Sequence, residues 1–86
     1  MENQLRKLIR LELGYGLKNR VEDGEKYLVR DLGTYEIEIS GSYNVGIGMY
    51  VWKKDGKERH IAESKSVTIS NIKQVYNEYL QKYESA

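Results

Sequence analysis

Apolar residues recur with a helical period at both ends of the chain. Near the N-terminus, positions three or four residues apart form a stripe of Leu5, Leu8, Ile9 and Leu13. A wider stripe near the C-terminus consists of Ile72, Val75, Tyr76, Tyr79, Leu80 and Tyr83. We therefore predict a helix in each terminal region. Because the chain has eight tyrosines and no phenylalanine, we expect the aromatic part of the core to come from Tyr35, Tyr76, Tyr79 and Tyr83.

Between these stripes, three segments alternate apolar and polar residues with the period of a half-buried strand. The segments are 34–40, 45–53 and 58–64. The dipeptide Asp55-Gly56 separates the second from the third and is a strong hairpin signal. The pattern predicts one α+β domain over residues 1–86 in the order α-β-β-β-α. We expect a three-stranded antiparallel meander with both helices packed on one face.

Residues 17–33 allow more than one prediction. Asp23-Gly24 could turn a hairpin between two short strands. Alternatively, Asp23 could cap a short helix that ends at Gly33, which is favoured by the helix formers Glu25, Lys26 and Arg30. An acidic surface segment with little regular structure is a third reading. The sequence favours the short helix slightly.

A two-residue turn at Asp55-Gly56 decides which residues of the hairpin share a face. Paired in this way, Trp52 faces Arg59. One face then carries Val45, Ile47, Met49, Val51, His60 and Ala62, and the other carries Gly46, Gly48, Tyr50, Trp52, Arg59 and Ile61. The aliphatic face better matches the C-terminal stripe, so we expect the helices to cover it. A turn one residue longer would reverse the faces and bury Trp52.

The uncovered face has the composition of a partner-binding surface. Aromatic residues and arginine supply most of the binding energy in interface cores. We therefore predict a contact centred on Tyr50, Trp52, Arg59 and Ile61, with a basic rim of Lys53, Lys54 and Lys57. The alternatives are burial of these residues beneath the segment 17–33 and a homodimer joined through the same face.

Catalytic and metal-binding chemistry has little support in the composition. The chain has no cysteine and one histidine, which excludes disulfides and a thiolate zinc site. His60 could pair with Glu58, but no third activating group is visible, so we expect no enzyme and no cofactor. No apolar run approaches the roughly 20 residues that span a bilayer. We therefore expect a soluble cytoplasmic protein with no membrane partner.

The charge pattern leaves nucleic-acid binding as an alternative. The net charge is only +1, whereas nucleic-acid-binding domains usually concentrate a larger basic excess on one face. In this alternative, Tyr50 and Trp52 would stack on bases. The phosphates would be bound by Arg6, Lys7, Arg10, Lys53, Lys54 and Lys57.

Two families resemble parts of this pattern. The predicted element order is similar to that of double-stranded RNA-binding domains, although their Gly-Pro-X-His loop has no counterpart in a chain without proline. The stretch ISGSYNVGIGMYVWKKDGKERHIAES and the following IKQVYNEYLQKY resemble small phage-encoded type II-A anti-CRISPR inhibitors. That resemblance implies a phage or mobile-element protein that inhibits a host CRISPR nuclease by mimicking DNA charge. Here such a role would fall to Glu22, Asp23, Glu25, Asp31, Glu36 and Glu38.

The leading hypothesis from the sequence is a small non-enzymatic interaction protein. It would bind and modulate a larger host protein, such as a nuclease, through the aromatic and arginine face of the hairpin.

Overall fold

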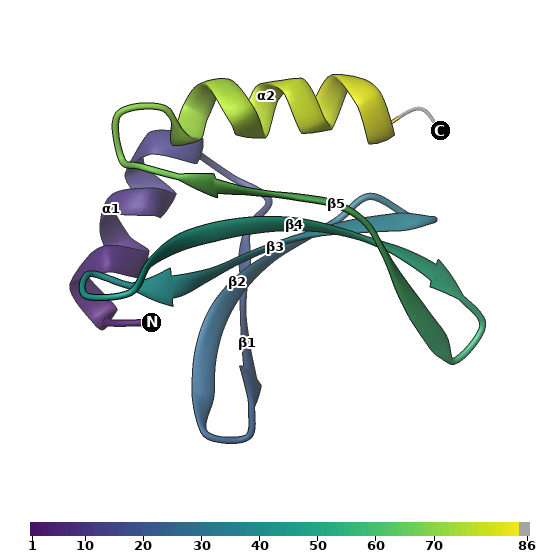
Figure 1. The fold of residues 1–86 in the computed structure, drawn as a ribbon, viewed down its shortest axis with the longest axis horizontal. Coiled ribbons are helices and arrows are strands. Elements are labelled where there is room, and N and C mark those ends of the chain that lie inside the picture. Colours follow the sequence, from purple (N-terminus) through teal and green to yellow (C-terminus); the bar gives the residue numbers. More distant parts are fainter. Residues whose placement is uncertain (85–86) are drawn as a thin grey trace.

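The computed structural model describes residues 1–84 and contains two helices and five strands. The last two residues of the predicted domain, 1–86, lie outside the described residues. All neighbouring strands are antiparallel, and the sheet order follows the chain. The elements are α1 (Asn3–Leu13), β1 (Lys18–Glu22), β2 (Glu25–Asp31), β3 (Tyr35–Ser42), β4 (Gly46–Asp55), β5 (Glu58–Val67) and α2 (Ile72–Tyr83) (Figure 1).

The α+β class is confirmed, but the prediction of three strands is wrong because residues 17–33 form two further strands. The short helix expected there is also wrong, and the hairpin alternative is confirmed. Asp23 and Gly24 both have positive φ, 52° and 79°, as a two-residue type I′ turn requires. In addition, β2 buries three consecutive residues, Tyr27, Leu28 and Val29. Burial on both faces of a strand outweighs the helix propensity of the exposed Glu25 and Lys26.

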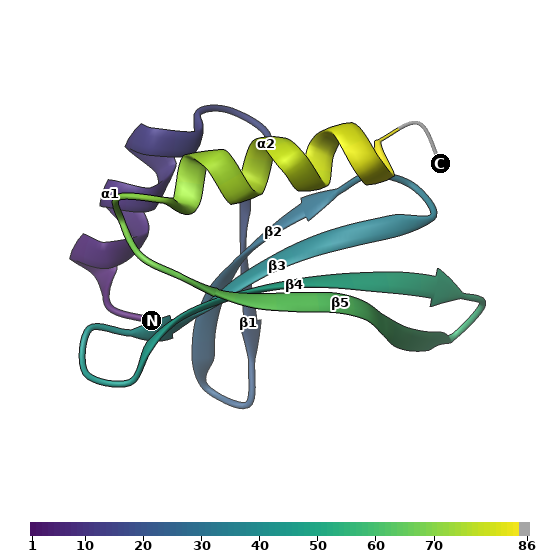
Figure 2. The ribbon, with the colours of Figure 1, turned by 45° about the horizontal axis from the view of Figure 1, so that its top comes forward.

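The main core lies between one face of the sheet and the two helices. α2 lies across this face, and α1 lies beside the sheet near the β3–β4 turn (Figures 1 and 2). The core consists of Leu5, Ile9, Leu17, Leu28, Ile37, Ile39, Ile47, Met49, Val51, Val67, Ile72, Val75, Tyr76, Tyr79 and Tyr83. Tyr35 packs against Tyr83 with ring centroids 4.8 Å apart, so the predicted tyrosine core is confirmed. We call this side of the sheet the helix-covered face.

The β4–β5 hairpin differs from the prediction in register but not in its faces. Asp55 pairs with Glu58, so the turn is Gly56-Lys57, and Trp52 faces Ile61 rather than Arg59. Glycine at the first turn position is typical of type II′ hairpins. The register moves by an even number of residues. Up to Ile61, each side chain therefore keeps the side of the sheet that the sequence predicts.

A β-bulge then changes the second half of β5. Val51 pairs with Glu63 and Trp52 with Ile61, which leaves Ala62 as the extra residue. The bulge places Glu63, Lys65 and Val67, rather than His60 and Ala62, beside the predicted core residues of β4. Burial of Ile47, Met49 and Val51 is confirmed, whereas His60 and Ala62 are exposed, as is Val45 in the β3–β4 turn.

Glu63 joins the bulged strand to the end of α2. Its Oε2 accepts a hydrogen bond from Lys82 Nζ at 2.6 Å and a second from the Tyr83 hydroxyl. The bond from Lys82, followed by that from Tyr83, holds the pKa of the Glu63 carboxyl below its usual value. A carboxylate with a lowered folded-state pKa stabilises the fold above its unfolded-state pKa, which is about 4.3. That contribution is lost as the pH falls through this value towards the lowered one.

We therefore expect Glu63→Gln to lower the free energy of unfolding at pH 7. The difference in this free energy between pH 7 and pH 3 should also be smaller than in the wild type. The measurement is urea unfolding at pH 7 and pH 3 for both proteins. Glu12→Gln, at an exposed position of α1, is the matched control and should keep the wild-type dependence. An unchanged difference between the two pH values in Glu63→Gln would show that this carboxylate does not tie β5 to α2.

Candidate protein-interaction surface

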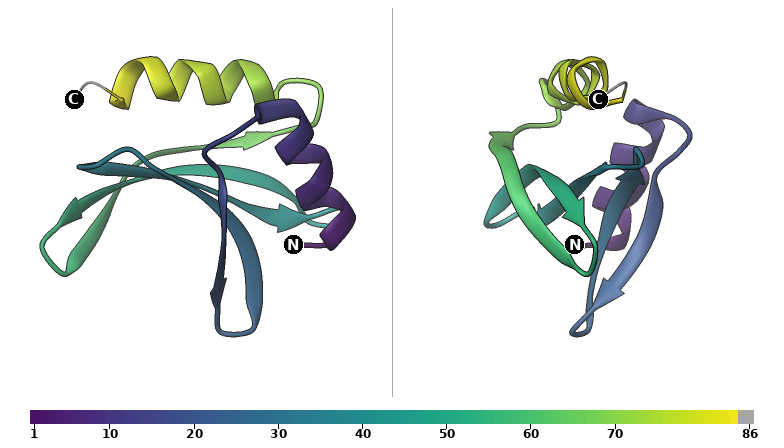
Figure 3. Two further views of the ribbon diagram at one scale, coloured as in Figure 1. Left: turned by 180° about the vertical axis from the view of Figure 1, so that it is seen from behind. Right: turned by 90° about the vertical axis from the view of Figure 1, so that its right-hand side faces the viewer.

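The sheet face opposite α2 is not covered by a second layer. Both hairpins, β1–β2 and β4–β5, bend away from α2, so this face lies on the inside of the bend (Figures 1 and 3). We call it the open face. Cross-strand partners share a face, which places on it Arg20 and Tyr27, Val29 and Glu38, Glu36 and Trp52, Tyr50 and Ser64, Trp52 and Ile61, and Lys54 and Arg59.

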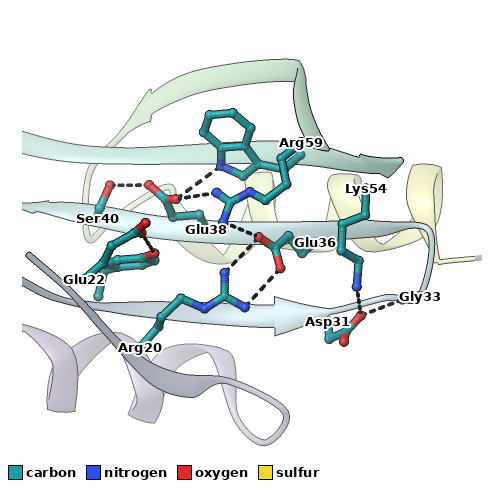
Figure 4. Close-up of polar contacts among 11 residues, drawn as sticks. Arg20, Glu22, Asp31, Gly33, Glu36, Glu38, Ser40, Lys54 and Arg59 are labelled. Carbon is teal, nitrogen blue, oxygen red and sulfur yellow. Dashed lines mark hydrogen bonds and ion pairs between the residues drawn. The ribbon is translucent and has the colours of Figure 1, made fainter. Parts of the chain in front are cut away.

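A buried carboxylate lies at the centre of the open face. Glu36 is only 2% exposed. Both of its oxygens accept hydrogen bonds from Arg20, at 3.0 and 3.2 Å, and Oε1 is also 3.1 Å from Arg59 (Figure 4). The hydrogen bond to Glu36 raises the pKa of the Arg20 guanidinium above its usual value. A carboxylate shielded from water requires such partners, because an unpaired buried charge is strongly destabilising.

Trp52 is held by the same group of residues. Its indole Nε1 donates to Glu38 Oε1 at 3.2 Å, and the Arg59 guanidinium lies 4.6 Å from the ring centroid. Arg59 also lies 3.5 Å from Glu38. The indole is therefore fixed by a hydrogen bond at its edge and a cation over its face. We call Arg20, Glu36, Glu38, Trp52 and Arg59 the charge network.

The structure brings together the four residues predicted for the centre of the contact. Tyr50, Trp52, Arg59 and Ile61 all lie on the open face. Trp52 is not beneath α2, and Ile61 is 52% exposed. The Tyr50 ring lies over Gly48 of the same strand, where a Cβ would approach the tyrosine hydroxyl to 2.6 Å. Glycine therefore leaves room for this ring to lie flat along the face.

The three predicted rim lysines do not form one group. Lys54 lies on the open face, where its Nζ is 2.7 Å from Asp31, and this hydrogen bond lowers the pKa of Asp31. Lys57 is in the turn at the tip of the β4–β5 hairpin. Lys53 pairs with Tyr35 and His60 and so belongs to the opposite side of the sheet. Lys53 therefore cannot be part of the same rim.

The sequence prediction missed Arg20 and gave Glu36 and Glu38 another role, mimicry of DNA charge. Glu36 and Glu38 alternate with Ile37 and Ile39, which indicated a polar side of the strand but not its partner residues. Arg20 could not be placed because β1 was not predicted. A hairpin at Asp23-Gly24 would have supplied the missing register.

The acidic block is mostly engaged within the fold. Glu36 and Glu38 contact arginines, Asp31 contacts Lys54, and Glu22 accepts a hydrogen bond from the Tyr27 hydroxyl. Four of the six carboxylates of this block therefore have a side-chain partner on the sheet.

The one histidine of the chain lies in an exposed pair with a glutamate. His60 and Glu58 lie 3.3 Å apart on the surface, with side chains 59% and 76% exposed. Residues 1–84 contain no cluster of potential metal ligands, and neither of their helices is long and apolar enough to cross a bilayer. A hollow of about 650 Å³ lies between β2 and β3, beyond their last pair, and Tyr27 and Ser40 line it. It contains no histidine or cysteine.

The charge network yields a stability prediction. Glu36→Gln keeps the shape of the side chain but removes the charge from between two guanidiniums. We expect a loss of about 1–3 kcal/mol in the free energy of unfolding, measured with urea at pH 7. Glu38→Gln is the matched control, since that side chain is 16% exposed and its arginine contact is longer; it should lose less than about 1 kcal/mol. Equal losses of unfolding free energy in the two variants would contradict the central position of Glu36.

Comparison with known protein families, curated proteins and solved structures found no match to this chain.

Proposed function

We propose that this chain is a non-enzymatic interaction protein whose open face binds a partner protein. The observation that carries the proposal is a partly exposed tryptophan, fixed by an arginine and a glutamate, on the sheet face that the helices leave uncovered. Binding is weakened by the cost of ordering side chains, and a side chain that is already fixed avoids much of that cost. The charge network thus pre-organises the centre of the contact.

The surroundings of Trp52 supply the remaining parts of an interface. Tyr50, two residues before Trp52 on β4, and the exposed Ile61, opposite Trp52 on β5, add apolar area next to the indole. The two hairpins bend towards this side of the sheet, so the face fits a convex surface or an inserted segment (Figure 3). Lys54 and Lys57 remain as the basic rim. An apolar and aromatic centre with a polar edge is the usual anatomy of a protein interface.

Nucleic acid is a less suitable partner for this face. The basic residues of the open face are Lys18, Arg20, Lys54 and Arg59. At least as many acidic residues share it, namely Glu22, Glu25, Asp31, Glu36 and Glu38. Arg20 and Arg59 are already paired with carboxylates. Binding to phosphates needs an excess of basic side chains, which release counterions from the nucleic acid. A face with balanced charges has no such excess.

The resemblance to type II-A anti-CRISPR inhibitors gives the first partner to test, a type II-A CRISPR nuclease. In this finer form of the proposal, the chain comes from a phage or mobile element and inhibits the nuclease. Because the acidic block is engaged within the fold, inhibition would come from docking of the aromatic centre rather than from mimicry of DNA charge.

We expect Tyr50→Ala and Trp52→Ala each to weaken binding to a purified type II-A nuclease at least tenfold, measured by calorimetry. Loss of an aromatic residue at an interface centre commonly costs 2 kcal/mol or more. Tyr43→Ala is the matched control, because Tyr43 is 54% exposed in the β3–β4 turn, away from the open face. Tyr50→Ala leaves the charge network intact. Weaker binding by this variant therefore reflects a lost contact rather than a less stable fold.

Two results would count against the proposal. If the nuclease does not bind, its identity as the partner is wrong. If the open-face variants and Tyr43→Ala bind it equally well, the open face is not the contact. Binding to DNA or RNA that falls steeply between two salt concentrations would instead support the nucleic-acid alternative.

A further inference from the structure

β5 forms an edge of the sheet with no partner on its outer side. Within the described residues the strand order ends at β5, and the end-on view shows no strand beyond it (Figure 3). This edge is ten residues long, twice the five residues of β1 at the other edge. An open edge presents a row of backbone N–H and C=O groups that can pair with another strand. We propose that two copies of the chain associate through this edge, β5 against β5 and antiparallel.

The bulge at Ala62 restricts the register of such a pair. Before the bulge, Glu58 and His60 lie on the helix-covered face; after it, Glu63 and Lys65 do. In a two-fold antiparallel pair, the first half of one β5 lies opposite the second half of the other. Residues on the helix-covered face of one copy lie opposite residues on the same face of the other only in every second register. A slip of one residue would place them opposite residues of the open face.

The charges on the helix-covered face favour one of these registers. In that register Glu58 of one copy faces Lys65 of the other, and His60 faces Glu63. A slip of two residues one way would place Glu58 opposite Glu63, and the opposite slip would separate Glu58 from Lys65 and place it opposite Val67. Opposite charges directly across two strands are favourable and like charges unfavourable. By symmetry each pair occurs twice in the dimer.

Charged residues and bulges usually protect an edge from pairing. On β5, the order of the charges along the strand instead places opposite charges across from each other in two antiparallel copies. All four side chains are available for this contact: Glu58, His60 and Lys65 are exposed, and Glu63 is 31% exposed. The bonds of Glu63 to Lys82 and Tyr83 use Oε2, which leaves Oε1 for the second copy. The dimer would be one continuous sheet with its two open faces side by side.

The test is sedimentation velocity of the full chain over a range of protein concentrations. We expect a monomer–dimer equilibrium in the wild type. Glu58→Lys and Lys65→Glu should each weaken the dimer about tenfold, because each change creates two like-charge pairs. The double variant E58K/K65E exchanges the charges across the same pairs and should restore the wild-type affinity to within about threefold. Both positions are exposed, so circular dichroism should confirm that every variant is folded.

Two outcomes would overturn the inference: a wild type that remains monomeric at all concentrations, or a double variant as weak as the single ones. Tyr50→Ala separates this inference from the proposed function, because Tyr50 lies on β4 and the open face rather than on the β5 edge. It should leave the dimer unchanged. If Tyr50→Ala abolishes the dimer and the charge variants do not, the copies associate through the open face instead.

Discussion

The pairing of Glu36 with two arginines is the interaction on which the open face depends. Glu36 is on β3, whereas Arg20 and Arg59 come from the first and last strands. One carboxylate therefore connects both edges of the sheet to its middle, across a face that has no helix to hold it. Without it, two guanidiniums would lie close together with reduced access to water, and repulsion between them would oppose the bend of the sheet.

The two faces of the sheet are stabilised by different means. The helix-covered face packs aliphatic side chains against the tyrosines of α2, whose hydroxyls reach polar groups at the edge of the core, such as Glu63 and Arg30. On the open face the buried apolar residues are Tyr27 and Val29, which are 7% and 4% exposed. The rest is a set of paired charges around an indole. A chain this short has one main core, and its second sheet face is left without a covering layer.

The sequence predicts the parts of this fold that follow from local periodicity. Both helices, the last three strands and the aliphatic side of β4 follow from spacing alone, as does the grouping of Tyr50, Trp52, Arg59 and Ile61. The β1–β2 hairpin was harder to predict, since Tyr27, Leu28 and Val29 are buried together and leave no alternation to detect. The charge network depends on the same missing strand. The bulge at Ala62 has no local signature, because it results from fitting one twisted strand against its neighbour.

Trp52 is the only tryptophan in the sequence, and it lies in the middle of the open face. The intrinsic ultraviolet emission of the indole thus comes from a single known place, between a guanidinium and a carboxylate. Any molecule that settles there must change the polarity around this fluorophore. The protein therefore carries its own optical reporter of occupancy, and titrations can be followed without attaching a dye.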